Sequence, residues 1–250
     1  MREELLSRRS GEIRGMFGRI AHRYDLLNRV LSLGQDVLWR RALSRAVAGS
    51  GAARVLDVCT GTADVALALP EGVEVLGTDF CLPMLARGRR KVAARGRRVP
   101  LFAGDALALP VAAGSLDAVT VAFGVRNFED LGAGLAELIR VLRPGGWLFI
   151  LEFSQPRGPL APLLGWWART VPPTVGRWLS GDPEAYSYLP ASVSTFPSLE
   201  RMTGVLHDLG LEAVTGKGLT GGVAALYGGR RPEIWARPEH PTVRQGMEVN

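Results

Sequence analysis

Short apolar runs alternate with amphipathic segments along most of the chain, and the two patterns predict different elements. The apolar runs predict strands at residues 54–58, 73–78, 99–103, 117–123, 146–153, 211–217 and 222–227. The amphipathic segments predict helices at residues 63–69, 82–95, 130–142 and 198–209. Because strands that alternate with helices are typical of α/β proteins, we predict a doubly wound, mostly parallel sheet.

Three parts of the chain do not follow this alternation. Residues 1–50 have apolar positions at helical spacing and predict an N-terminal helical cover. Residues 155–197 are rich in prolines and bulky aromatics, as expected of an insertion that determines substrate specificity. From Gly228 onward the chain is rich in Gly, Pro and Arg, which predicts a flexible tail at residues 231–250. Residues 51–230 then form the central domain.

Acidic residues follow three predicted strands in order, namely Asp57, Asp79 and Asp105. An open parallel sheet binds ligands outside the carboxyl ends of its strands, so we expect these carboxylates to converge on one crevice. Two of them have a purely structural alternative. Asp57 and Asp79 are both placed to cap the turn or helix that follows them.

The turn after the first strand distinguishes between two classes of cofactor. It contains a single glycine, Gly61, whereas a dinucleotide site requires the spacing G-x-G-x-x-G, so NAD is disfavoured. S-adenosylmethionine (SAM) carries no phosphate and needs only one close backbone approach. Asp79 suits its ribose diol, while the Asp105 carboxylate and the Ala106 N–H suit its adenine. The sequence therefore predicts SAM binding.

Composition excludes several classes of protein. Of 250 residues, 47% are hydrophobic and 22% are charged, which is typical of a soluble globular protein. No apolar run approaches the length of a membrane span, and the charged N-terminus lacks a signal core, so we expect a cytoplasmic location. With two cysteines and three scattered histidines, we predict neither a disulfide framework nor a metal site.

The net charge of +6 raises the possibility of a nucleic-acid partner. Nearly all of this positive charge comes from arginine, and its densest run, residues 87–98, fits a solvated helix face followed by a loop. No RNA-binding module is recognisable, so we expect no nucleic-acid partner. An anionic membrane surface fits such a charge equally well.

Several motifs resemble those of a known family. They are Tyr24–Ser32 followed by Trp39, Phe123–Asn127, Arg140–Gly146, Leu151–Ser154 and Tyr186–Pro190. Over residues 12–230 the chain resembles the demethylmenaquinone/ubiquinone C-methyltransferases. The resemblance implies a seven-stranded SAM-methyltransferase sheet, with Thr62, Asp79, Asp105 and Ala106 at SAM-contact positions. The chain departs from the family pattern at Leu27, where Met is usual, at Asp36, where His is usual, and at Ala122, where Ser is common.

The resemblance also implies the chemistry, which is methyl transfer from SAM to a ring carbon of a prenylated quinol, most simply demethylmenaquinol. The protein must then align the two substrates and stabilise a phenolate. Arg126 is the candidate partner of the oxyanion and Asn127 orients the ring. Tyr24, Asn28 and Tyr186 are candidate pocket residues, with Asp25 or a water as the base. Arg126 has the alternative of pairing with Glu129 or Asp130, and the two tyrosines have the alternative of simple packing.

Because a prenylated quinol resides in the bilayer, we expect peripheral contact with the inner face of the membrane. An interfacial patch is predicted at Trp166, Trp167, Arg169, Arg177 and Trp178, although these tryptophans are also suited to packing on the sheet. Three other functions stay open at this point. They are O- or N-methylation of another phenolic acceptor, nucleic-acid methylation, and SAM binding without turnover. The sequence favours no oligomeric state.

Overall fold

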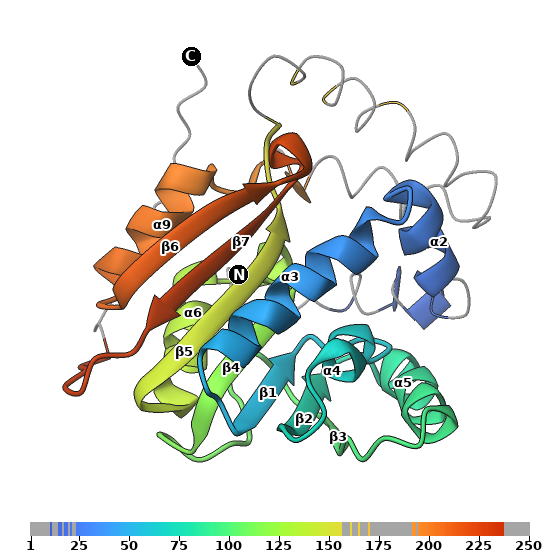
Figure 1. The fold of residues 1–250 in the computed structure, drawn as a ribbon, viewed down its shortest axis with the longest axis horizontal. Coiled ribbons are helices and arrows are strands. Elements are labelled where there is room, and N and C mark those ends of the chain that lie inside the picture. Colours follow the sequence, from blue (N-terminus) through green and yellow to red (C-terminus); the bar gives the residue numbers. More distant parts are fainter. Residues whose placement is uncertain are drawn as a thin grey trace.

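The computed structural model describes residues 24–156 and 195–237, together with residues 11, 15, 16, 18, 19, 21, 161, 165, 170, 192 and 193. A twisted sheet lies at the centre, with helices on both of its faces (Figure 1). Its seven strands have the order β3-β2-β1-β4-β5-β7-β6. They are β1 (Arg54–Val58), β2 (Glu74–Asp79), β3 (Leu101–Ala103), β4 (Leu116–Ala122), β5 (Leu142–Phe153), β6 (Glu212–Leu219) and β7 (Ala224–Arg230).

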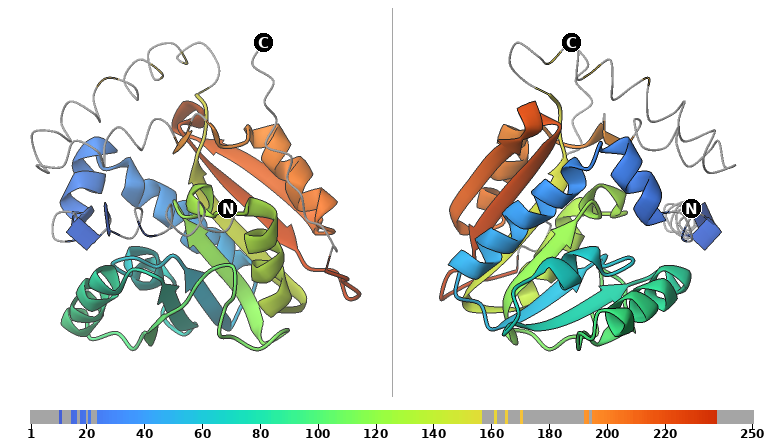
Figure 2. Two further views of the ribbon diagram at one scale, coloured as in Figure 1. Left: turned by 180° about the vertical axis from the view of Figure 1, so that it is seen from behind. Right: turned by 45° about the vertical axis from the view of Figure 1, so that its right-hand side comes forward.

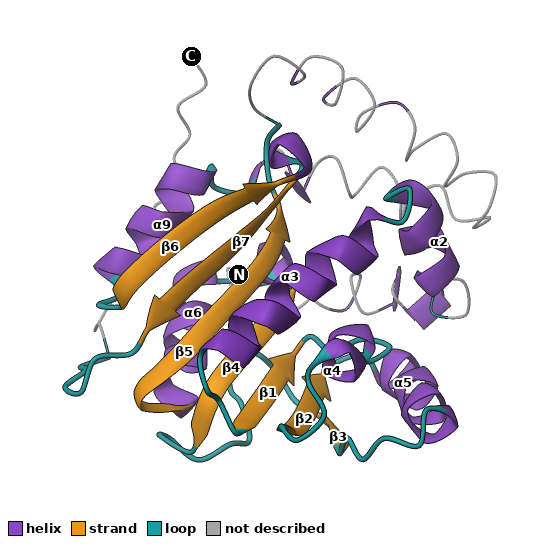
Figure 3. Cartoon of the chain, in the orientation of Figure 1, coloured by secondary structure: helices purple, strands orange, loops and turns teal. Residues whose placement is uncertain are grey.

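The helices occupy most of the segments between the strands (Figure 3). The α-helices are α2 (Tyr24–Leu31), α3 (Gln35–Gly49), α4 (Asp64–Ala68), α5 (Leu82–Ala94), α6 (Leu131–Val141) and α9 (Leu199–Asp208). Two short 3₁₀ helices are η1 (Val125–Asn127) and η2 (Thr220–Gly222). Within the described residues, no helix combines the length and apolar character needed to cross a membrane.

Strands β1 to β5 pair in parallel, whereas β7 runs antiparallel between β5 and β6. The predicted doubly wound, mostly parallel sheet is therefore confirmed. Most element boundaries agree with the sequence pattern to within two residues. The largest difference is β5, which begins at Leu142, directly after α6, rather than at residue 146.

The chain order around β1 determines where a ligand can bind. β1 lies between β2 and β4, so the connections that leave β1 and β4 run to opposite sides of the sheet. This reversal opens a crevice above the carboxyl ends of the strands, which is where open α/β sheets bind their ligands. The loops after β1, β2, β3 and β4 border that crevice.

Helices cover both faces of the sheet (Figure 2), and a buried apolar cluster holds them on each face. On one face, Leu135 and Ile139 of α6 and Met202 of α9 belong to a single buried cluster. On the other face, α3 buries Trp39, Leu43 and Val47 in a second cluster that includes residues of α4 and α5. The indole N–H of Trp39 also donates to the Thr220 hydroxyl at 2.9 Å. Helix α3, part of the predicted N-terminal cover, is thus integral to the core.

Residues 231–237, which the sequence assigns to the tail, make specific contacts with the domain. The Arg231 guanidinium donates to the carbonyl oxygens of Ile139, Arg140 and Leu142 at the C-terminal end of α6, where the helix dipole favours a cation. It also lies 5.1 Å from the ring centre of Trp235, whose indole N–H donates to Leu209 O at 2.8 Å. Residues 238–250, most of the insertion and most of residues 1–23 lie outside the described part of the chain.

Replacing Trp235 by Ala tests whether these contacts stabilise the domain. We expect the free energy of unfolding to fall by about 1–3 kcal/mol, because a hydrogen bond, a cation–π contact and buried ring area are lost together. Urea unfolding measures the change. Ile234→Ala is the matched control, since the Ile234 side chain is 93% exposed and its removal should have little effect. Equal stability of the two variants would show that residues 231–237 contribute nothing.

Candidate active site

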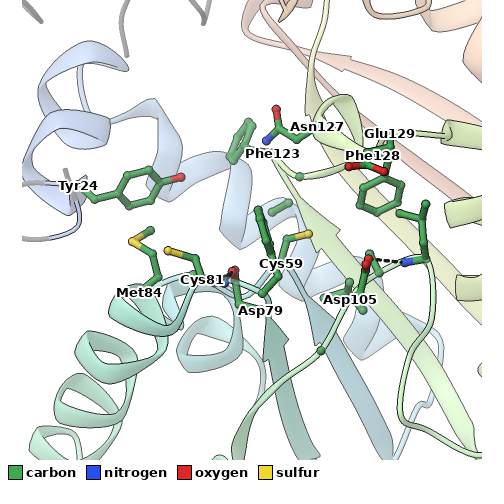
Figure 4. Close-up of a pocket in the computed structure, with 18 residues that line it drawn as sticks. Tyr24, Cys59, Asp79, Cys81, Met84, Asp105, Phe123, Asn127, Phe128 and Glu129 are labelled. Carbon is green, nitrogen blue, oxygen red and sulfur yellow. Dashed lines mark hydrogen bonds between the residues drawn. The ribbon is translucent and has the colours of Figure 1, made fainter. Parts of the chain in front are cut away.

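A pocket lies at the carboxyl edge of the sheet and encloses about 880 Å³, including space that is open to solvent. Figure 4 shows the side chains that line it. They come from the loops after β1, β2, β3 and β4 and from helices α2 and α5: Tyr24, Val58, Cys59, Gly61, Asp79, Phe80, Cys81, Met84, Gly104, Asp105, Ala106, Leu107, Ala122, Phe123, Gly124, Asn127, Phe128 and Glu129.

Asp79, the last residue of β2, holds two of these loops together. One of its carboxylate oxygens accepts the Gly61 N–H at 2.8 Å, and the other accepts the Cys81 N–H, also at 2.8 Å. Burial raises the pKa of Asp79, and the backbone N–H bonds offset this effect only in part. Helix capping and ligand binding, the two interpretations of Asp79, are therefore compatible. Asp79 fixes the start of α5 and also faces the pocket (Figure 4).

The loop after β1 approaches the pocket through Gly61, whose φ of +55° lies in the left-handed region. A Cβ at this position would come within 3.4 Å of the Met84 methyl group. The next residue, Thr62, is buried and is not among the lining residues. Its hydroxyl donates to Asp25 Oδ1 at 2.6 Å and accepts from the Lys91 ammonium at 3.1 Å. Thr62 thus lies behind the wall that Gly61 forms.

Asp105 and Ala106 line the β3 side of the pocket, as the sequence predicts for an adenine site. The Asp105 carboxylate is exposed and accepts the Leu107 N–H at 2.9 Å, which orients it at the pocket edge (Figure 4). Asp79 and Asp105 therefore lie on one pocket, and two of the three predicted carboxylates converge.

The third carboxylate, Asp57, does not join the crevice, and this part of the prediction is wrong. Asp57 is buried below the pocket, where it accepts the hydroxyls of Thr60 at 2.7 Å and Thr120 at 2.8 Å. It also accepts a backbone hydrogen bond from Ala66 in the first turn of α4, so the capping alternative holds for this residue. Burial, together with the nearby Asp79, raises the pKa of Asp57 to about 7, although its hydrogen bonds oppose the rise.

The loop after β4 forms the opposite wall and packs tightly on the loop after β1. Cys59 and Phe123 both have φ near the left-handed region, at +54° and +57°, which is uncommon for residues other than glycine. Gly124, which follows Phe123, has no room for a side chain, since a Cβ there would lie 2.7 Å from the Cys59 Cβ. Burial raises the pKa of the Cys59 thiol. Cys59 and Cys81 are free cysteines, as predicted, and both line the pocket.

Arg126 lies behind this wall rather than on it. Its guanidinium bonds to Glu152 Oε1 and to Phe123 O, both at 2.6 Å, and its side chain is only 6% exposed. Of the two alternatives for Arg126, an ion pair is present, but its partner is Glu152 of β5, whose side chain is fully buried, rather than Glu129 or Asp130. Arg126 Nε has no hydrogen-bond partner among the described residues. Asn127 does line the pocket.

Helix α2 carries three of the residues that the sequence predicts for the methyl-acceptor pocket, namely Tyr24, Asp25 and Asn28. The Tyr24 hydroxyl points into the pocket (Figure 4). Burial raises the pKa of this phenol, and a hydrogen bond with Asn28 and the charge of Arg126 only partly offset the rise. Asn28 and Asp25 are not among the lining residues. Burial also favours a higher pKa for Asp25, but hydrogen bonds and charges from Lys91, Thr62 and Arg87 outweigh it, so the pKa is lowered. Tyr186 and the tryptophan patch lie outside the described residues.

Sequence reasoning missed several residues that form this site. Phe123 and Met84 line it, and Glu152 compensates the charge of Arg126. For Glu152 a signal was present, because a carboxylate inside the apolar run of β5 requires a buried cation as its partner. Phe123 carried a signal too, because it begins the Phe123–Asn127 motif, whereas Met84 carried none beyond its position at the start of a helix.

The sequence is similar to that of several known proteins. Residues 5–231 match the model of the ubiE/COQ5 methyltransferase family. The chain belongs to this family. It is 48% identical to the demethylmenaquinone methyltransferase of Thermus thermophilus, over 87% of this chain and all of that protein. It is 44% identical to the ubiquinone/menaquinone biosynthesis C-methyltransferase UbiE of Syntrophotalea carbinolica, over 88% of this chain and 94% of that protein.

A solved structure supports the fold independently. A SAM-dependent methyltransferase from Thermotoga maritima, described as a possible histamine N-methyltransferase, aligns with a TM-score of 0.61 and 18% identity. The alignment covers 87% of this chain and 98% of that one. At such low identity the likeness concerns the fold alone. The predicted SAM-methyltransferase architecture and family resemblance are thereby confirmed.

The raised pKa of Asp57 predicts a dependence of stability on pH. An unfolded Asp ionises near pH 3.9, whereas the folded one holds its proton up to about pH 7. Its contribution to the free energy of unfolding is therefore complete at low pH and is lost as the pH rises from about 4 to about 7. Asp57→Asn cannot ionise, so its stability should decline less over this interval. Some decline should persist, because the pKa of Asp79 is raised too.

Urea unfolding of both proteins at several pH values across this interval measures the difference. An Asn side chain offers the Thr60 and Thr120 hydroxyls one acceptor and one donor, as a neutral carboxyl group does. Identical pH profiles for the two proteins would show that Asp57 is ionised in the folded state.

Proposed function

We propose that this protein transfers a methyl group from SAM to a ring carbon of a prenylated quinol, most simply converting demethylmenaquinol to menaquinol. One observation carries the proposal: Asp79 and Asp105 share a single pocket with Tyr24 and Asn127 in a member of the ubiE/COQ5 methyltransferase family. Relatives at 42–48% identity bear the name demethylmenaquinone methyltransferase, which supports the naphthoquinol as acceptor.

The residues of the pocket fit SAM. The Asp79 carboxylate, already fixed by two backbone N–H groups, provides acceptors for a ribose diol. Asp105 and the Ala106 N–H suit the adenine edge, and Gly61 allows the methionine part to approach the backbone closely. In this proposal Thr62 acts from behind the wall by fixing Gly61. When bound, SAM supplies a methyl group activated on a sulfonium.

On the acceptor side, the ring carbon becomes nucleophilic when the neighbouring hydroxyl loses its proton. Tyr24 keeps its own proton at neutral pH because its pKa is raised, so its hydroxyl is a donor for a quinol oxygen. Asn127 orients the ring, and Arg126, whose charge is paired with Glu152, supports the loop behind Phe123 and keeps a free Nε–H there. Asn28 fixes Tyr24 by a hydrogen bond. Tyr186 stays in the proposal as a pocket residue.

Asp25 is a poor candidate for the base, since its lowered pKa weakens it as a proton acceptor. We therefore assign the proton-accepting step to a water in the pocket and assign Asp25 to the support of α2. The prenyl tail of the acceptor resides in the bilayer, so the proposal includes contact of the protein with the cytoplasmic membrane surface. The charge of +6 suits anionic lipid.

Asp79→Ala tests the cofactor side. We expect SAM affinity to fall by about 2–3 kcal/mol, because charge-assisted hydrogen bonds to the ribose are lost. Titration calorimetry measures the affinity, and circular dichroism confirms that the variant is folded. Asp105→Ala is the matched comparison and should weaken SAM less, since the Ala106 N–H contact survives. Unchanged affinity in a folded Asp79→Ala variant would exclude the proposed ribose site.

Acceptor identity is tested with SAM carrying a radiolabelled methyl group. Demethylmenaquinol and a benzoquinol that lacks the ring methyl are supplied side by side, each in reduced and oxidised form. We expect label on a ring carbon of the reduced naphthoquinol, because only the quinol has a hydroxyl whose deprotonation activates the carbon. Label on oxygen or nitrogen would contradict C-methylation, and turnover of the oxidised quinone would contradict the phenolate mechanism.

A further inference from the structure

Helix α2 carries Tyr24 into the pocket, and a single lysine of α5 connects this helix to the cofactor loop. The Lys91 Nζ lies 2.7 Å from Asp25 Oδ2 of α2, 2.6 Å from Asp64 Oδ1 of α4 and 3.1 Å from Thr62 Oγ1. The Lys91 side chain is only 19% exposed. One ammonium group therefore joins three separate segments around the pocket.

The residue type is informative here. The chain contains 30 Lys and Arg residues, of which only Lys91 and Lys217 are lysines. A preference for arginine this strong means that positive charge alone does not account for a lysine at this point. An ammonium group has three donors arranged around one atom, which can reach acceptors in three directions, whereas a guanidinium donates within a plane. The three acceptors around Lys91 match the ammonium group.

Thr62 makes the connection direct. Its hydroxyl donates to Asp25 Oδ1 at 2.6 Å, and Asp25 is the neighbour of Tyr24. Thr62 directly follows Gly61, whose N–H donates to the Asp79 carboxylate. A continuous series of contacts thus runs from the carboxylate proposed for the ribose to the tyrosine proposed for the acceptor.

The same network continues to the far end of α2. Arg40 of α3 lies 3.4 Å from Asp64 and also pairs with Asp36, which in turn lies 3.4 Å from Arg29. Asp36, the departure from the family's usual His, is thus a buried carboxylate between two arginines. Both ends of α2 are held by ion pairs, and Lys91 is the point where this network meets the cofactor loop.

We propose that Lys91 is a positioning residue that couples the cofactor loop at Gly61 and Thr62 to helix α2, so that an ordered cofactor loop holds Tyr24 in the acceptor site. This inference rests on the proposed function for the roles of the two sides. Linkage requires that the effect be reciprocal, so ordering the loop stabilises α2 and ordering α2 stabilises the loop. Lys91 itself touches neither substrate.

The test compares Lys91→Arg and Lys91→Met with the control Arg90→Met, at the exposed neighbour of Lys91 on α5. Hydrogen exchange of the α2 amides is followed by mass spectrometry with and without SAM, which requires no acceptor. In the unmodified protein and the control, SAM should slow exchange in α2 by about tenfold. In both Lys91 variants, α2 should exchange faster and respond to SAM little, while amides of β1 and β4 stay protected.

Steady-state kinetics provides the second readout. Lys91→Arg keeps the charge, yet it should raise the KM for a short-tailed quinol acceptor by about tenfold and change the SAM dissociation constant less than about threefold. Normal α2 protection in Lys91→Arg would overturn the proposal. Faster exchange throughout the sheet would also overturn it, because that pattern indicates a general loss of stability. If no quinol is methylated by any protein, the proposed function fails, while the exchange experiment still decides the coupling.

Discussion

The Asp79 carboxylate is the interaction on which the site depends. By accepting the N–H groups of Gly61 and Cys81, it fixes the loop after β1 to the start of α5 across the crevice between strands. The position of Gly61 then determines that of Thr62, and Thr62 bonds to Asp25 on α2. The lone pairs that these backbone donors leave free on the carboxylate are available to the ribose of the proposed cofactor.

A second buried carboxylate, Asp57, influences the electrostatics of the site. Asp57 is surrounded by hydroxyl groups and apolar strands, and both burial and the proximity of Asp79 raise its pKa to about 7. Two ionised carboxylates in so little water would repel each other, and the neutral form of Asp57 avoids this cost. The hydroxyls of Thr60 and Thr120 accommodate either form, because each is both a donor and an acceptor. Protonation of Asp57 thus limits the repulsion between the two carboxylates.

The sheet and the cofactor side were predictable because they depend on local pattern. The strands are read from their apolar runs, and a carboxylate just past a parallel strand belongs to the ligand edge, as Asp79 and Asp105 show. The prediction that Asp57 joins the crevice was wrong because Asp57 is the last but one residue of β1. Successive strand residues point to opposite faces of the sheet, so its side chain points away from the face that the last residue of the strand presents. The partner of Glu152 was not predictable, since Arg126 is 26 residues away and reaches it only because η1, after β4, packs beside β5. The same holds for Lys91, whose partners come from α2, from α4 and from the loop just before α4.

The two sides of the pocket are stabilised in different ways, and this bears on how the protein works. The cofactor side is built on central strands that pair through backbone hydrogen bonds on both edges, so its geometry varies little. The acceptor side depends on α2, a helix of eight residues held by side-chain ion pairs and a small apolar cluster of Ala21, Tyr24, Cys81 and Met84. Helices this short are unstable on their own. A segment with so few buried contacts opens at low free-energy cost. In the proposed function, a prenylated acceptor enters when α2 moves away. Because Lys91 and Thr62 connect α2 to the loop after β1, this movement loosens that loop as well, while the hydrogen bonds between the strands below it stay in place.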